Sequence, residues 1–198
     1  MNIDRDLVTI INCLDTYLDD GMSKMKWFVS FGTLLYLIRD KKHGKEFDTD
    51  MDISIVGEHN FEQIDGNLKE NGFEECTRII NDTTKSILFA SYKSSNGLHL
   101  DLFFWIKVDN YYFHTYDYMR DSTDGRPSFY HFKSLPPYMF EGDTINYEWI
   151  ESMSPLKIPA LYGTLLDYWY PNWFTPDEDF GTSRCDEILE PKTCEGLC

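Results

Sequence analysis

Two aspartates one residue apart, Asp50 and Asp52, are the residues of this sequence best suited to chemistry. Residues 51–56 alternate and predict a strand, on which both carboxylates project from one face while Met51 and Ile53 face the core. Two carboxylates so close repel each other unless a cation neutralises them, and Mg²⁺ prefers such oxygen ligands, with phosphates completing its shell. The spacing favours a divalent-metal site, and the alternative is a solvated acidic strand end.

A third aspartate, Asp101, interrupts the strongly apolar segment 98–105, which also predicts a strand. A carboxylate within so apolar a strand is costly unless it is paired or bound to metal. If this strand lies beside residues 51–56, Asp101 becomes a third metal ligand; the alternative is a structural role, accepting hydrogen bonds from Lys or Arg. His99 shares its face, and we expect it to be a structural neighbour because Mg²⁺ does not favour imidazole.

Gly32 and Thr33 end the apolar run 27–31, which has the length of a strand, and a short helical segment over 34–39 is expected to follow. Gly32 lets the backbone approach a phosphate, and the free N–H groups at a helix start attract anions. Thr33 adds a hydroxyl donor. Gly-Thr alone is a weak motif, but an Asp-x-Asp strand shortly after it makes a phosphate site a much stronger prediction.

The remaining chain supplies helices and strands to position these residues. Helical periodicity and a capping box at Asn60 and Gln63 predict helices over 7–18, 61–71 and 160–170. Strand-like runs cover 74–80, 86–92, 98–108 and, across an Asp109-Asn110 turn, 111–116. The pattern indicates an α+β domain over residues 1–176, with a mixed sheet and helices packed on it, and an acidic tail over 177–198.

Composition narrows the class of protein further. The 198 residues carry a net charge of −16, which argues against a nucleic-acid partner because phosphates require a basic surface. No stretch approaches the roughly 18–20 apolar residues that span a bilayer. The N-terminus lacks the basic and apolar regions of a signal peptide. We therefore expect no membrane span and a cytoplasmic protein.

The five cysteines do not suit a disulfide scaffold, because their number is odd and the domain is large enough without one. Cys13 and Cys76 are expected to be core residues. Cys185, Cys194 and Cys198 cluster near the end without the fourth ligand that a zinc site requires, and the sequence assigns them no role.

Gly-Thr at a helix start, Asp-x-Asp on a strand and a single Asp on a later strand together resemble the nucleotidyltransferase superfamily of DNA polymerase β type. The finer resemblance is to the LicD family, the phosphocholine and polyol-phosphate transferases that include fukutin and its relatives. Its first block reads Gly-Thr-Leu-Leu, then Arg, then Trp-Asp-x-Asp-hydrophobic-Asp. Residues 32–35, Arg39 and 47–53 match this block, with Phe47 in place of Trp and a slightly longer loop.

Two further segments support the resemblance. Residues 100–103 are similar to the family's hydrophobic-Asp-hydrophobic-Phe block, and residues 166–176 to its Leu-x3-Tyr-Gly-x-Trp-x2-Pro block. Pro171 stands where the last block has glycine. The resemblance thus extends from residue 27 to residue 176, and it implies a nucleotidyltransferase (DNA polymerase β-like) fold.

The resemblance also implies an activity. Such enzymes transfer a phospho-alcohol, phosphocholine or a polyol phosphate, from a CDP-linked donor to a hydroxyl of a glycan or small-molecule acceptor, and CMP is released. The implied cofactor is Mg²⁺ or Mn²⁺, bridging pyrophosphate oxygens and carboxylates. Carried onto this chain, Asp50 and Asp52 are metal ligands, and Asp101 is the third ligand or the base that accepts the proton of the acceptor. Asp48 is an alternative ligand or supports the others.

The same resemblance gives the phosphate-binding residues. Gly32 and Thr33 would cradle phosphate, and Arg39 would pair with phosphate or with Asp48. A purely structural salt bridge that fixes the Asp-rich loop is the alternative for Arg39.

Two other functions stay open at this point. The first is a nucleotidyltransferase in the narrower sense, which moves NMP from an NTP to a small molecule or protein, because the same three carboxylates serve both reactions. The second is a catalytically silent domain of the same fold. Retention of buried like charges weighs against the silent domain, since such a domain has no need of them.

Overall fold

The computed structural model describes residues 3–18, 27–40, 49–57, 60–80, 85–108, 111–113, 115–117, 129–131, 138, 142–147, 155–170 and 172–175. Phe47, Asp48 and the predicted tail over 177–198 with its three cysteines lie outside these ranges. Within the described part of the chain, no helix is both long and apolar enough to cross a membrane.

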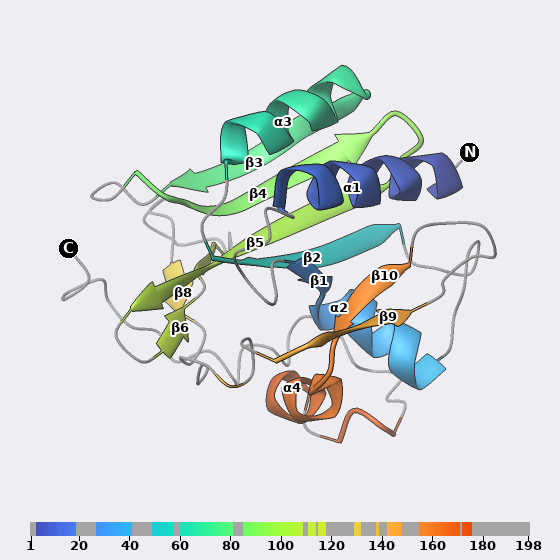
Figure 1. The fold of residues 1–198 in the computed structure, drawn as a ribbon, viewed down its shortest axis with the longest axis vertical. Coiled ribbons are helices and arrows are strands. Elements are labelled where there is room, and N and C mark those ends of the chain that lie inside the picture. The colour runs from blue at the N-terminus through green and yellow to red at the C-terminus, as the bar shows by residue number, and fades with distance from the viewer. Residues whose placement is uncertain are drawn as a thin grey trace, which may run out of the picture.

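A mixed sheet forms the centre of the molecule. Its strands run in the order β1-β2-β5-β4-β3, with β6 also paired to β5 (Figure 1). Their bounds are β1 (Trp27–Val29), β2 (Asp50–Val56), β3 (Phe73–Ile80), β4 (Ile87–Ser94), β5 (His99–Val108) and β6 (Tyr111–Phe113). β2 and β5 are parallel and the other pairs are antiparallel. The predicted class, α+β with helices packed on a mixed sheet, is confirmed.

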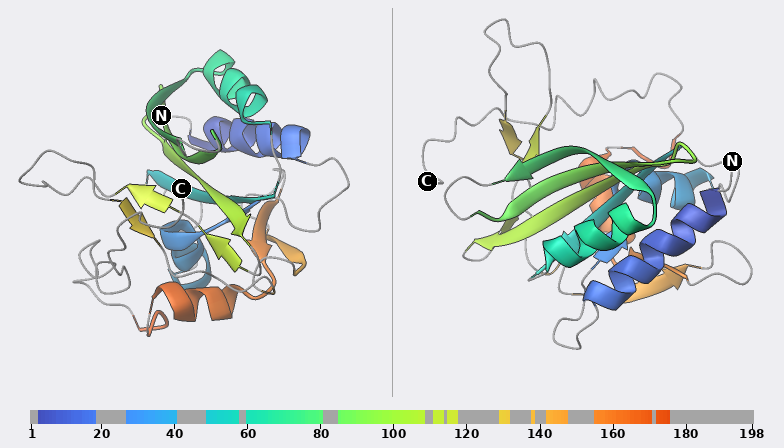
Figure 2. Two further views of the ribbon diagram at one scale, coloured as in Figure 1. Left: turned by 90° about the vertical axis from the view of Figure 1, so that its left-hand side faces the viewer. Right: turned by 90° about the horizontal axis from the view of Figure 1, so that it is seen from above.

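Helices lie on both sides of this sheet. α1 (Ile3–Leu18) and α3 (Phe61–Glu70) cover one face, while α2 (Phe31–Leu35) and α4 (Tyr162–Trp169) lie on the other side (Figures 1 and 2). The predicted apolar stripe of α1 is confirmed, since Leu7, Ile10, Ile11, Leu14 and Leu18 are all buried. The side-chain oxygen of Asn60 accepts the Gln63 N–H at 3.4 Å and so caps α3.

The two faces of the central strands differ in chemistry. Met51, Ile53 and Ile55 of β2 are buried, on the face opposite to Asp50 and Asp52. Because the side-chain period of a strand is two, these apolar residues and the carboxylates are separated by the thickness of the sheet. Burial of the apolar face therefore fixes the face on which the carboxylates emerge.

The segment after β1 differs from its prediction. The strand ends at Val29 rather than at Phe31, α2 begins at Phe31, and a π-helical turn, η1 (Tyr36–Asp40), continues it. Phe31 has a φ of +44°, an unusual backbone conformation for a non-glycine residue. Thr33 and Asp52 form two hydrogen bonds, which hold the first turn of α2 against β2 and explain why the helix begins before residue 34.

Several smaller elements were not predicted correctly. Residues 111–113 pair with β5 as expected, but residues 115–117 form a separate strand, β7 (Thr115–Asp117), which pairs with β8 (Phe129–His131). The hairpin of β9 (Thr144–Tyr147) and β10 (Leu156–Pro159) was not predicted. Cys13 is buried as predicted. The prediction for Cys76 is wrong, because it lies exposed at an irregularity of the β3–β4 pairing.

Candidate metal centre

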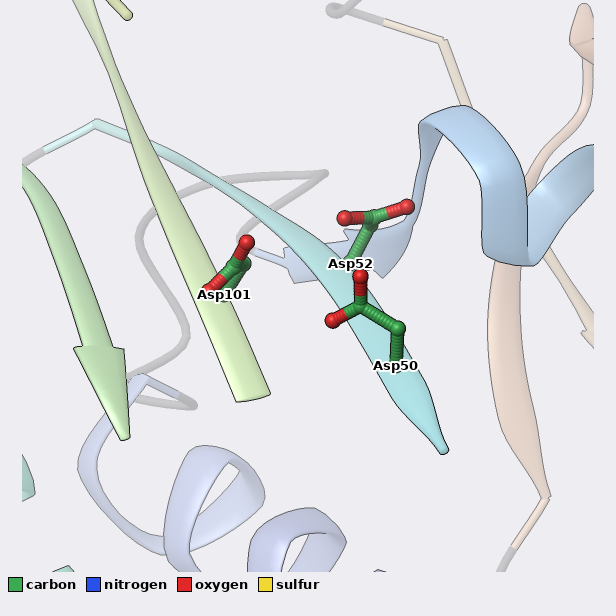
Figure 3. Close-up of side chains that lie close together, drawn as sticks. All are labelled: Asp50, Asp52 and Asp101. Atoms are coloured by element: carbon green, nitrogen blue, oxygen red, sulfur yellow. The ribbon is translucent and has the colours of Figure 1, made fainter. Parts of the chain in front are cut away.

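Parallel pairing of β2 with β5 brings the three aspartates together. The register places Asp52 beside Asp101 and Asp50 beside His99, so the three carboxylates emerge on one face of two adjacent strands. One oxygen from each carboxylate lies within 4.8 Å of the others, and Figure 3 shows the three groups converging between the two strands. The condition set by the sequence, that the strand of Asp101 lie beside residues 51–56, is therefore met.

The three carboxylates differ in burial. Asp50 is exposed, whereas Asp52 and Asp101 are partly buried. Burial raises the pKa of Asp52 well above its usual value, and the nearby charges of Asp50 and Asp101 raise it further. Burial also raises the pKa of Asp101 to about 6, with repulsion from Asp50 adding to the effect. Without a cation, the three groups resist full ionisation.

These residues fit a divalent metal ion. Carboxylate oxygens are the ligands that Mg²⁺ and Mn²⁺ prefer, and Mg²⁺ is usually held by one or two carboxylates together with water and substrate phosphates. The exposed Asp50 leaves one side of the triad open to such ligands. A bound cation would also reverse the electrostatic cost of the three clustered charges.

The start of α2 is tied to Asp52. The Asp52 carboxylate accepts the Thr33 N–H at 3.3 Å and also the Gly32 N–H, while the Asp52 N–H donates to Thr33 Oγ1 at 2.7 Å. A Cβ at position 32 would lie 3.2 Å from Asp52 Oδ2, so glycine is the residue that fits here without displacement. In this structure these N–H groups serve Asp52, and their contact with phosphate stays a prediction.

Arg39 lies in η1, where it forms a bidentate ion pair with Asp40. Its Nε and terminal nitrogen donate to the two Asp40 oxygens at 2.6 and 2.8 Å. This pair raises the pKa of Arg39. Asp48, the predicted partner, lies outside the described residues. The sequence did not anticipate the pair with Asp40, and binding of phosphate by Arg39 stays a prediction.

Ser91 of β4 is a site residue that the sequence analysis missed. The β4–β5 register places it beside Asp101, and its hydroxyl donates a hydrogen bond to the Asp101 carboxylate that opposes the rise in pKa. Alternation along β4 could have grouped Ser91 with Phe89 and Lys93 on one face. No local pattern shows that β4 pairs with β5.

An aromatic cluster lies next to the triad. The Phe103 ring packs against Phe31 and Phe89 at centroid distances of 4.7 and 5.2 Å, and Phe31 stacks on Trp169 of α4 at 4.4 Å. Because these rings join β5, β4, α2 and α4, they hold the helix start against the strands that carry the carboxylates. Trp169 is buried, and its role here is packing.

No family model matches the chain, and no curated protein matches it. Among solved structures, the chain is similar to the antibiotic-resistance factor ANT(2'')-Ia, with 12% identity, a TM-score of 0.46, and 95% of this chain and 82% of that chain covered. At this level the similarity supports no assignment of activity, so functional proposals rest on the residues of the site.

Proposed function

We propose that this chain is a metal-dependent transferase of the nucleotidyltransferase type that acts on a nucleotide-linked phosphate donor. The observation that carries the proposal is the convergence of Asp50, Asp52 and Asp101 from two parallel strands beside the start of a helix. The raised pKa values of Asp52 and Asp101 mean that these groups destabilise the metal-free protein when ionised. A domain without activity would gain stability by losing them, which favours a catalytic role.

The arrangement suits transfer of a phosphorus-containing group. The three carboxylates would hold Mg²⁺ or Mn²⁺, which neutralises charge that builds on the leaving phosphate. The acceptor hydroxyl oxygen forms a bond to the donor phosphorus while the bond to the leaving oxygen breaks. Asp101 is either the third ligand or the base that takes the hydroxyl proton. Ser91 keeps this carboxylate oriented in both cases.

The finer proposal concerns the donor. The block running from Gly32 to Asp52 resembles that of the LicD family, and on this ground we propose a CDP-linked alcohol, with phosphocholine or a polyol phosphate passing to a hydroxyl of a glycan or small molecule. Gly32, Thr33 and Arg39 would then contact donor phosphate, with Asp48 supporting the metal ligands. The alternative is NMP transfer from an NTP, in which pyrophosphate leaves instead of CMP.

Thermal stability with Mn²⁺ and candidate donors tests both levels of the proposal. Wild-type protein, Asp52→Asn and the control Asp4→Asn are scanned with Mn²⁺ plus CDP-choline, CDP-ribitol, CDP-glycerol, CTP or ATP. Asp4 is exposed in the first turn of α1, across the sheet from the triad. We expect a metal-dependent rise in Tm with one CDP-alcohol in wild type and Asp4→Asn but not in Asp52→Asn. A rise with triphosphates alone favours NMP transfer, and no response to Mn²⁺ in wild type contradicts the proposal.

A further inference from the structure

Lys93, the penultimate residue of β4, lies on the same face of the sheet as the triad. The β4–β5 register pairs Ser91 with Asp101 and Lys93 with His99. The Ser91 hydroxyl reaches the Asp101 carboxylate, so Ser91 points to the face of the triad. Lys93 lies two residues further along the same strand and points the same way. Its side chain is exposed.

The position of Lys93 brings its ammonium within reach of ligands on the triad. Residues diagonally opposed on adjacent antiparallel strands are about 7–8 Å apart, a separation that long side chains bridge. Lys93 and Asp101 stand in this relation. Figure 3 shows the Asp101 carboxylate on β5, on the side that faces Asp50 and Asp52. A phosphate bound beside Asp101 would lie within range of Lys93, because the two residues are diagonal neighbours on adjacent strands and the lysine side chain is long.

The backbone that carries Lys93 is held firmly. The hydroxyl of Ser94, its neighbour, donates to Asp6 of α1 at 2.6 Å, and the Asn96 side chain donates to the same carboxylate at 2.9 Å. The Leu98 N–H donates to Ser94 Oγ at 3.1 Å and closes the turn between β4 and β5. Lys93 thus extends from a fixed strand end beside the site.

Most basic side chains of the described residues are committed to other carboxylates. Ion pairs join Arg39 to Asp40, Lys69 and Arg78 to Asp65 and Glu75, and Lys157 to Asp15. Within the described ranges, Lys93 and Lys85 form no ion pair, and Lys85 precedes the far end of β4. Glu74 lies opposite Lys93 in the β3–β4 register, but their charged atoms do not approach to salt-bridge distance.

The negative charge around the triad favours a basic side chain close to a bound phosphate. The chain has a net charge of −16, and the site contributes three carboxylates. A nucleotide phosphate that approaches this surface is repelled unless positive charge stands near the metal. Among the basic residues whose side chains the structure describes, Lys93 lies on the sheet face of the triad and has no ion-pair partner. Its contact with a phosphate oxygen would be a charge-assisted hydrogen bond.

We propose that Lys93 binds the phosphate groups of the nucleotide donor beside a metal ion held by Asp50, Asp52 and Asp101. This inference rests on the proposed function of the triad and adds a phosphate-binding residue to it. The ligand class it names is the di- or polyphosphate part of the donor. The role is one of binding, so Lys93 contributes to affinity for the donor without contributing a metal ligand.

Calorimetric titration of inorganic pyrophosphate in the presence of Mg²⁺ tests this inference. The variants are Lys93→Ala, Lys93→Arg as the conservative change, and Lys85→Ala as a control: Lys85 is also an exposed lysine, but it lies before the opposite end of β4. We expect Lys93→Ala to raise the Kd for pyrophosphate by about 10-fold, with smaller effects of Lys93→Arg and Lys85→Ala. The difference should narrow as salt increases.

Separate readouts distinguish failure of this inference from failure of the proposed function. Stabilisation by Mn²⁺ alone is measured on the same variants, and Lys93→Ala should not lower it, because Lys93 is not a metal ligand and its positive charge repels the ion. Equal pyrophosphate affinity in Lys93→Ala and wild type overturns the inference, as does a wild type that responds to Mn²⁺ but binds no pyrophosphate. A wild type without any response to metal overturns the proposed function and the role of Lys93 with it.

Discussion

Replacing Asp101 with asparagine should stabilise the metal-free protein at neutral pH. Burial and the charge of Asp50 raise the pKa of Asp101 from 3.8 to about 6 in the folded state. Between these two values the folded protein binds more protons than the unfolded chain, so its free energy of unfolding falls as pH rises through this window. Asparagine does not titrate, so the variant does not lose free energy of unfolding as pH rises through this window. Its side-chain oxygen can still accept the Ser91 hydrogen bond.

The size of the effect follows from the shift in pKa. A rise of about two pKa units corresponds to about 3 kcal/mol. Because Asp101 is only partly buried, we expect the variant to gain about 2–3 kcal/mol in its free energy of unfolding above pH ~7. The gain should shrink toward pH ~4, where Asp101 is protonated in the folded wild type. Mn²⁺ at roughly 1,000 times its Kd should reverse the ranking, since metal at that concentration stabilises the wild type by about 4.1 kcal/mol.

Urea unfolding followed by tryptophan fluorescence measures this prediction. Wild type, Asp101→Asn and Asp4→Asn are unfolded at several pH values, first with a chelator and then with Mn²⁺. An Asp101→Asn protein that is less stable than wild type at every pH in the chelator would refute the reasoning. Such a result would mean that the ionised carboxylate is a structural partner of a basic group.

Three further changes test how neighbouring residues support the triad. Gly32→Ala should weaken Mn²⁺ binding about 10-fold in calorimetry, because the alanine Cβ would lie 3.2 Å from Asp52 Oδ2 and displace that carboxylate. Unchanged Mn²⁺ affinity would show that the start of α2 moves to make room for the methyl group. Ser91→Ala should raise the pKa of Asp101 further and shift the pH midpoint of Mn²⁺ binding upward, with Ser91→Thr close to wild type. Tyr92→Phe removes a hydrogen bond to Asp65 on the opposite face of the sheet and should lower the free energy of unfolding in urea by about 1 kcal/mol. Its Mn²⁺ affinity should be unchanged, and a changed affinity would contradict the separation of the two faces.

Local sequence patterns predicted the parts of this fold that depend on periodicity. The apolar stripe of α1 and the cap of α3 follow from residues a few positions apart, and both are present in the structure. The placement of Asp50 and Asp52 on one face of a strand likewise depends only on alternation. Such features need no knowledge of which segments meet in space.

Contacts between distant segments set the limits of the prediction. The hydrogen bond from Ser91 to Asp101 depends on the pairing of β4 with β5. The hydrogen bond between Thr33 and Asp52 depends on the packing of α2 against β2. The β9–β10 hairpin brings together segments that carry no clear strand pattern. Cys76 was misplaced because an irregularity in the β3–β4 ladder leaves it exposed.

Binding of Mn²⁺ to the triad is the central claim, and electron paramagnetic resonance of free Mn²⁺ tests it most directly. Free aqueous Mn²⁺ gives a sharp signal that is lost on binding, so titration with protein reports occupancy without any assumed substrate. We predict a saturable loss of signal with wild type and Asp4→Asn, and almost none with the double variant Asp50→Asn/Asp52→Asn. Equal loss of signal with all three proteins would place the metal elsewhere and contradict the account.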